Sequence, residues 1–205
     1  MRKYLASFLL VGLLSFIALS SISVPAQDEN EEQSSAGYAR QLSNTDPAVR
    51  QAGAEGLARL VDLKQRKLLE GYLLQEKDKR VRLAIQWALY RLGKSELLFQ
   101  IVRDFDSSRH DQAVGYLSQL ESSEPLYVFI KQEDTHPKIL VGLLEVLGRI
   151  GDKDTLQQIQ PFQDHFEPKV ADAAKQATVL IQERLAESQP VTKTRPRTTS
   201  KPDQR

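Results

Sequence analysis

The chain has 205 residues, of which 28 are Lys or Arg and 27 are Asp or Glu, so its formal net charge is +1. This near-balance argues against a dedicated nucleic-acid-binding protein, which usually carries a strong basic excess. The chain has no cysteine, which excludes disulfides, cysteine-ligated zinc and cysteine nucleophiles.

The first 26 residues have the layout of a secretory signal peptide. Arg2 and Lys3 precede an uncharged apolar run at 5–19, and the sequence Val-Pro-Ala at 24–26 places small residues before a polar stretch. We therefore expect an exported and periplasmic protein whose signal is residues 1–26. An uncleaved inner-membrane anchor is the alternative, because the apolar run approaches the roughly 20 residues that span a bilayer.

Two polar segments flank the central part of the chain. Residues 27–34 are acidic, and residues 188–205 are basic and contain prolines but almost no large apolar side chains. Neither segment has enough apolar content to bury a core, so both are expected to be disordered. The folded domain is therefore predicted at 35–187.

A pattern of apolar residues repeats within this domain. Its anchors are Val49, Val81, Arg109, Ile139 and Val170, which are separated by 32, 28, 30 and 31 residues. Mostly apolar residues follow each anchor after four, eight and eleven residues, which is the spacing of one stripe on an amphipathic helix. Mostly small residues that let a neighbouring helix approach come seven residues after the anchors: Gly56, Ala88, Tyr116, Val146 and Ala177. The pattern predicts five copies of one helical unit.

Helix-capping residues precede these helices. The residues three positions before the anchors are Asp46, Asp78, Asp106, His136 and Glu167. An aspartate carboxylate accepts hydrogen bonds from the free N–H groups of the first turn, so the three aspartates are interpreted as structural N-caps. Proline follows the cap in three of the five units, at the first helical position, where no N–H is needed.

Another apolar helix precedes each capped helix. These first helices are predicted at 35–43, 64–75, 95–104, 124–132 and 154–163. One helix pair cannot bury both of its faces, whereas stacked pairs share a continuous core. The predicted fold is an all-α solenoid of about five helix pairs.

Two of the units resemble HEAT repeats. The matching residues are Asp-Pro-Ala-Val-Arg at 46–50 with Leu57 and Leu60, and Asp-Lys-Arg-Val-Arg at 78–82 with Leu89, Leu92 and Gly93. The resemblance is to the short class of HEAT repeats that phycobilin lyase subunits also contain, and it covers about residues 35–186. It implies a right-handed stack of helix pairs that binds proteins on the face of the second helices. Arg109 departs from the pattern, because an aliphatic anchor is expected there.

The sequence contains no recognisable catalytic motif. It has neither a Gly-x-Ser-x-Gly nucleophile motif nor a glycine-rich phosphate-binding loop. His110, His136 and His165 lie near the starts of capped helices, either as a metal-binding or pH-sensing edge or as ordinary exposed turn residues. Neighbouring repeats lie about 10 Å apart, too far to share one small ion. We expect no metal, no cofactor and no enzymatic activity, and a lyase-type enzyme is only a remote alternative.

The single tryptophan is the best candidate for a binding residue. Trp87 lies six residues past its anchor, where the other repeats carry Glu55, Gly115, Glu145 and Gln176. Leu83, Trp87 and Tyr90, together with Arg91, are predicted to form an exposed patch that binds a partner. The alternative is that a neighbouring repeat covers Trp87, because solenoid helices touch on both flanks.

A weaker candidate is a row of arginines. Arg59, Arg91 and Arg149 each lie ten residues past an anchor, and Gln119 interrupts the row. The row can receive acidic side chains of a partner. The alternative is local pairing near helix C-termini, where cations are favoured.

These observations favour a non-enzymatic protein- or peptide-binding scaffold of the bacterial cell envelope that binds on the face of the second helices. No nucleic-acid partner is expected, and the basic tail is expected to contact an anionic envelope surface only weakly. The alternative is a structural or accessory subunit that self-associates through its solenoid ends, where Val179 and Leu180 are expected to be exposed.

Overall fold

The structure is a computed structural model that describes residues 34–188. The described residues form ten α-helices and three short 3-10 helices, with no strand among them, so the predicted all-α class is confirmed. The predicted signal peptide, nearly all of the acidic segment and the basic tail from 189 onward lie outside the described residues. Within the described part, no helix is long and apolar enough to cross a membrane.

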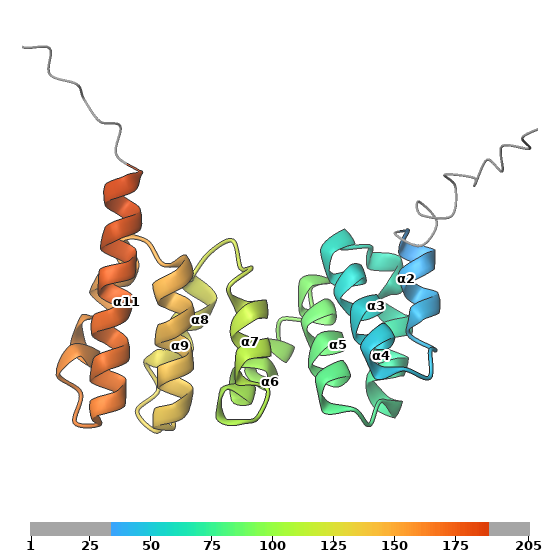
Figure 1. Cartoon of the computed structure of the whole chain (residues 1–205), viewed down its shortest axis with the longest axis horizontal. Helices are drawn as coiled ribbons and strands as arrows, with labels where there is room; N and C mark the ends of the chain where they lie inside the picture. The colour runs from blue at the N-terminus through green and yellow to red at the C-terminus, as the bar shows by residue number, and fades with distance from the viewer. Residues whose placement is uncertain (1–33, 189–205) are drawn as a thin grey trace, which may run out of the picture.

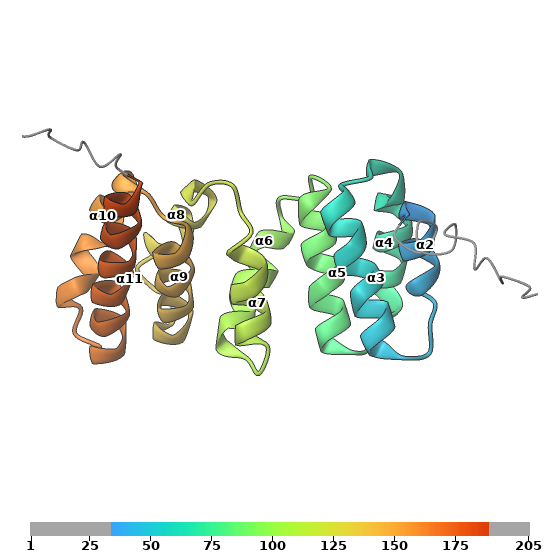
Figure 2. The same cartoon turned by 45° about the horizontal axis from the view of Figure 1, so that its top comes forward.

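The helices form five consecutive pairs. The first helices are α2 (Ser35–Gln41), α4 (Arg66–Gln75), α6 (Leu97–Arg103), α8 (Glu124–Ile130) and α10 (Lys153–Ile159). The second helices are α3 (Pro47–Leu60), α5 (Lys79–Arg91), α7 (His110–Leu117), α9 (Pro137–Ile150) and α11 (Pro168–Glu187). The 3-10 helices are η1 (Leu63–Gln65), η2 (Asp104–Asp106) and η3 (Gln160–Asp164). Figures 1 and 2 show the second helices side by side in one row, so the predicted solenoid of about five helix pairs is confirmed.

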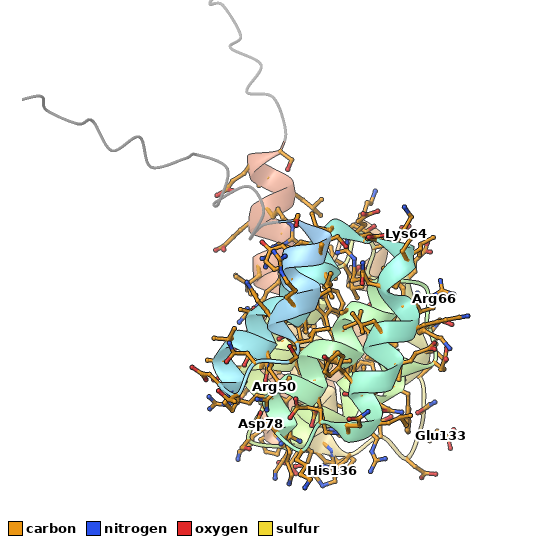
Figure 3. The ribbon with its side chains drawn as sticks, turned by 90° about the vertical axis from the view of Figure 1, so that its right-hand side faces the viewer. Arg50, Lys64, Arg66, Asp78, Glu133 and His136 are labelled. Carbon is orange, nitrogen blue, oxygen red and sulfur yellow. The ribbon has the colours of Figure 1, made fainter. Side chains whose placement is uncertain are left out.

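Two of the predicted aspartate caps are present. The Asp46 carboxylate accepts a hydrogen bond from the Ala48 N–H at 2.8 Å, at the start of α3. The Asp78 carboxylate accepts from the first turn of α5 at 2.8 and 3.1 Å. His136 caps α9, and Figure 3 shows Asp78 and His136 at the same lower edge of the molecule. The second helices therefore begin along one edge of the array.

The prediction that Asp106 caps the third of these helices is wrong. Residues 104–106 form η2, and Ser107 Oγ then accepts a backbone N–H at 3.0 Å, so α7 begins only at His110. Asp106 instead forms an ion pair with Lys138 Nζ at 2.8 Å. The third repeat is therefore shorter and less regular than its neighbours.

Arginines in the two HEAT-like sequences stabilise the turns between helices. Arg50 Nε donates to Glu76 Oε2 at 2.7 Å, and its Nη1 donates to two carbonyl oxygens of the preceding turn, both at 2.9 Å. Arg82 Nη1 donates to Leu73 O at 2.7 Å and to Glu76 O at 3.1 Å. These bonds satisfy carbonyl oxygens that would otherwise be left unpaired in the turns.

The small residues expected at close helix contacts do pack closely, with one exception. Gly56 lies against Tyr38 of α2, where an added Cβ would be 2.3 Å from the ring. Ala177 lies against Gly148 of α9, where an added Cβ would be 2.9 Å from the Ala177 Cα. The third repeat carries Tyr116 at this position, and α5 and α7 approach each other over much less of their length than α3 and α5 do (Figures 1 and 2). Helix spacing depends on the side chains at the contact, so the α5–α7 interface is wider than the α3–α5 interface. We call it the α5–α7 seam.

Candidate functional site

The predicted patch on α5 is not an exposed surface. Leu83 and Trp87 are only 0% and 2% exposed, so the prediction that they form an exposed patch is wrong. The neighbouring repeat covers the indole, as the alternative interpretation proposed, because the Tyr116 ring stacks on it. The Arg91 guanidinium lies 5.6 Å from the indole centroid and covers it further. Tyr90 and Arg91 remain half-buried at the surface.

The hydroxyl of Tyr116 connects α7 to α3. It donates to Glu55 Oε1 at 2.6 Å and accepts from Gln112 Nε2 at 2.8 Å. Gln51 Nε2 donates to the same Glu55 oxygen at 2.8 Å. Burial and the hydrogen bond to Glu55 raise the pKa of Tyr116 far above its ordinary value, so the hydroxyl remains protonated and continues to donate.

Two adjoining hollows follow the α5–α7 seam, one on the face of the second helices and one at the C-terminal ends of α5 and α7. The first has a volume of about 320 Å³, and its lining includes Glu55, Arg59, Gln112, Gly115 and Gln119, with Trp87 and Tyr116 beneath. The second has a volume of about 410 Å³, and its lining includes Tyr90, Arg91, Gln119, Leu120 and Pro125. Gln119 lines both hollows, so they meet at this side chain, and we call them together the seam groove.

The seam groove combines an aromatic floor with polar walls. Gln119 is exposed, and its amide donates only to Gly115 O, which leaves one donor and the acceptor for a peptide group. The Gln112 amide donates to Arg80 O and to the Tyr116 hydroxyl, and its Oε1 is buried. Gly115 lies between the two glutamines and is exposed, and an added Cβ there would meet nothing within 4 Å. The groove therefore has room for a polypeptide backbone and an amide side chain that can hydrogen-bond to it.

The arginines of the predicted row each have a local partner. Arg59 lies 5.7 Å from the centroid of the Tyr38 ring, and Arg149 Nη2 is 2.6 Å from Glu145 Oε1. Arg91 lies over Trp87, as described above. Arg59 and Arg91 line the seam groove, whereas Arg149 is not part of its lining. The structure thus favours local pairing over a continuous basic row.

His110 links the start of α7 to η2 through one ring nitrogen and to α9 through the other. Its Nδ1 is 3.0 Å from Phe105 O, and its Nε2 is 3.0 Å from Glu145 Oε2. Both partners are acceptors, so the arrangement favours a ring that is protonated on both nitrogens. Burial lowers the pKa of His110, but these two hydrogen bonds outweigh that effect, and the pKa is raised above its ordinary value.

The three histidines do not form one site. His136 caps α9, and His165 stacks on Phe162 and Phe166, with ring centroids 6.3 and 4.4 Å apart. Across residues 34–188, no group of three or more His, Asp or Glu side chains is arranged to hold a metal ion.

No protein-family model and no curated protein sequence matches the chain. Among solved structures, it is similar to human deoxyhypusine hydroxylase in complex with glycerol, with 16% identity, coverage of 75% of this chain and 76% of that chain, and a TM-score of 0.33. It is also similar to an engineered protein, with 16% identity, coverage of 77% and 83%, and a TM-score of 0.38. Similarity at this level carries no argument about function. The helix arrangement itself defines the chain as an α-solenoid.

Proposed function

We propose that the chain is a non-enzymatic scaffold that binds an extended segment of a partner protein in the seam groove. The observation that supports this most strongly is the groove itself. At one interface of the array, a stacked pair of aromatic residues replaces close helix packing and leaves two adjoining hollows at the surface. An α-solenoid presents such surfaces for binding along its length.

The residue types that line the groove suit a polypeptide ligand. Gln119 can hydrogen-bond to peptide groups, and Gly115 lets the ligand backbone approach α7 closely. Tyr90 and Arg91, at the other end, belong to the types that dominate binding energy at protein interfaces. One extended segment can therefore contact both ends of the groove.

We also propose that the chain belongs to the short HEAT-like class and is exported to the bacterial cell envelope. The sequences at 46–50 and 78–82 support the first proposal, since both arginines stabilise turns as described above. The layout of residues 1–26 supports the second, and an uncleaved membrane anchor remains its alternative. A role without catalysis is proposed because the sequence lacks a catalytic motif.

Blocking the groove tests the binding proposal. A photo-crosslinking amino acid at Gln119, introduced in the native host, identifies the segment of the partner that occupies the groove. A synthetic peptide of that segment is then titrated against the wild-type chain and Gly115→Tyr by isothermal calorimetry. The added side chain fills the groove without a clash at Cβ, so binding should weaken by about tenfold or more.

Gly71→Tyr is the matched control. Gly71 also lies inside a helix, α4, and an added Cβ there meets nothing within 4 Å. This variant should bind the peptide as the wild-type chain does. Equal binding by Gly115→Tyr and the wild-type chain would contradict the proposal.

A second candidate function is self-association through the C-terminal end of the solenoid. Val179 and Leu180 on α11 are 51% and 46% exposed, as the sequence predicted. The same helix also exposes Asp172, Lys175 and Glu183, which is typical of a polar capping helix. Sedimentation velocity of the purified chain tests this candidate. Dimers that appear with rising concentration would support it, and a monomer at all concentrations would contradict it.

A further inference from the structure

A separate cleft lies between α5 and α6, and none of its lining residues lines the seam groove. Its volume is about 520 Å³, within the range of sites that bind ligands. Four of its lining side chains are basic and only Asp104 is acidic; the basic residues are Lys79, Arg82, Arg103 and Arg109. The whole chain has a net charge of only +1, so this cleft is a local concentration of positive charge.

Most of this charge is not neutralised by the protein. Arg109 pairs with Asp104, and its Nε is 3.1 Å from the carboxylate. Lys79, Arg82 and Arg103 have no carboxylate within ion-pair distance in the part of the chain that the structure describes. Three of the cations that line the cleft therefore have no carboxylate partner among the described residues, which favours an anionic ligand.

One of these cations is held in place before any ligand binds. Both hydrogen bonds that fix Arg82 to Leu73 O and Glu76 O come from Nη1. Its Nε and Nη2 make no hydrogen bond to any described residue. A guanidinium that is already ordered loses less conformational entropy on binding than a free side chain.

An exposed aromatic ring adds an apolar contact. Phe99 is 51% exposed, although it lines the cleft. Its ring stacks on Phe129 of α8 with 6.4 Å between centroids, and the Arg103 guanidinium lies 5.8 Å from its centroid. These contacts hold the ring at the surface, where it can pack against an apolar side chain of a ligand.

The cleft also contains an amide pair. Gln86 is only 8% exposed, and its Nε2 donates to Gln100 Oε1 at 2.6 Å. This bond leaves the Gln86 carbonyl as an acceptor, and the Gln100 amide with donors that bond to no described residue. A peptide group needs one acceptor and one donor, so the pair can bind a polypeptide backbone.

We infer that this cleft binds an acidic peptide segment of a protein partner, in which carboxylates flank an apolar side chain. The cations come from α5, from the end of α6 and from the turn before α7, so they suit several separate carboxylates better than one compact phosphate. The aromatic ring and the amide pair fit the same ligand. The inference does not depend on the seam groove.

Fluorescence anisotropy tests the inference with a defined probe. The probe is a fluorescein-labelled peptide of alternating glutamate and serine with a central phenylalanine, titrated with the purified chain. The same peptide with glutamine in place of every glutamate is the ligand control, and it should bind about tenfold more weakly or worse. The affinity for the acidic peptide should also fall as salt concentration rises.

Charge removal locates the binding site. The double variant Lys79→Gln/Arg103→Gln should bind the acidic peptide at least about tenfold more weakly than the wild-type chain. Both side chains are exposed and form no ion pair with a described residue, so the fold should be retained. The matched control is Lys64→Gln/Lys67→Gln, which removes the same charge elsewhere; Figure 3 shows Lys64 at the opposite edge from Asp78. This control should bind normally.

Three results would overturn the inference. The first is unchanged binding by the cleft variant, with the single variant Lys79→Gln as a second test if the double variant fails to fold. The second is an equal loss in the control variant, which would indicate non-specific attraction. The third is binding of tripolyphosphate, but not of the acidic peptide, which would indicate a phosphate site.

Discussion

The rings of Trp87 and Tyr116 lie parallel, with 2° between their planes and 5.7 Å between their centroids, and they join α5 to α7. At this separation parallel rings are offset, which is a favourable arrangement. Tyr116 is bulky at a position where the other repeats carry Gly, Ala or Val. The pair therefore fills the α5–α7 seam and forms the floor of the seam groove above it.

Removing the indole should destabilise the fold. Trp87→Ala leaves a cavity in the core, and the free energy of unfolding should fall by about 3–5 kcal/mol. Urea denaturation followed by circular dichroism measures this change. Arg91→Ala serves as the comparison, and it should cost about 1 kcal/mol because it removes only a partly exposed cation–π contact. A loss below about 1 kcal/mol for Trp87→Ala would mean that the indole is not packed.

Substitution by alanine at Gly115 and at Gly142, which both lie in second helices, should change the free energy of unfolding in opposite directions. Gly115→Ala should raise the free energy of unfolding by up to about 1 kcal/mol, since alanine favours the helix and its Cβ meets no atom. Gly142→Ala should lower it by about 1–3 kcal/mol, because the new Cβ would stand 2.4 Å from the Phe105 ring. Thermal unfolding of the two variants, compared with the wild-type chain, gives the sign of each change in stability. The packing described here would be contradicted if both variants shifted in the same direction.

The link from His110 to Glu145 should make stability depend on pH. The raised pKa of His110 means that its protonated ring is bound more favourably in the folded chain than in the unfolded one. This contribution is complete below the unfolded value of about 6.5 and is lost as the pH rises through the higher folded value. The free energy of unfolding of the wild-type chain should therefore exceed that of His110→Gln, and the difference should be larger at about pH 5.5 than at about pH 8.5.

The difference in stability between the wild-type chain and His110→Gln reports on His110 alone, because both proteins retain the other two histidines. Glu145→Gln should reduce the same pH dependence, because it removes the carboxylate that accepts from Nε2. Urea denaturation at the two pH values is the measurement. A stability difference between wild type and His110→Gln that does not change with pH would show that the ring is not held in its protonated form.

Local rules were sufficient to predict the fold. The apolar stripe, the caps at Asp46 and Asp78 and the prolines after the caps each depend on residues close together in sequence, and these features placed the helix pairs correctly. The prediction for Asp106 was wrong because residues 104–106 form a 3-10 helix, and Ser107 accepts the backbone N–H ahead of α7 in place of Asp106. The sequence of the third repeat carried a sign of this difference in Arg109, which occupies the position of an aliphatic anchor.

The candidate site was harder to predict, because its geometry depends on two different repeats. Helical spacing placed Trp87 correctly on the face of the second helices, but it could not show that a side chain from the next helix covers it. Tyr116 was the missed residue. Its size, at a position where every other repeat is smaller, was the available signal that the α5–α7 interface differs from the others.

Tryptophan fluorescence tests the central claim, that Trp87 lies beneath Tyr116 in a closed seam. The chain has one tryptophan, so the emission reports on this position alone. The emission maximum of the purified chain should lie at short wavelength, and iodide should quench the emission only slightly, as expected for an indole that is 2% exposed. A red-shifted emission that iodide quenches readily would show an open seam, and it would contradict both the stack and the groove built on it.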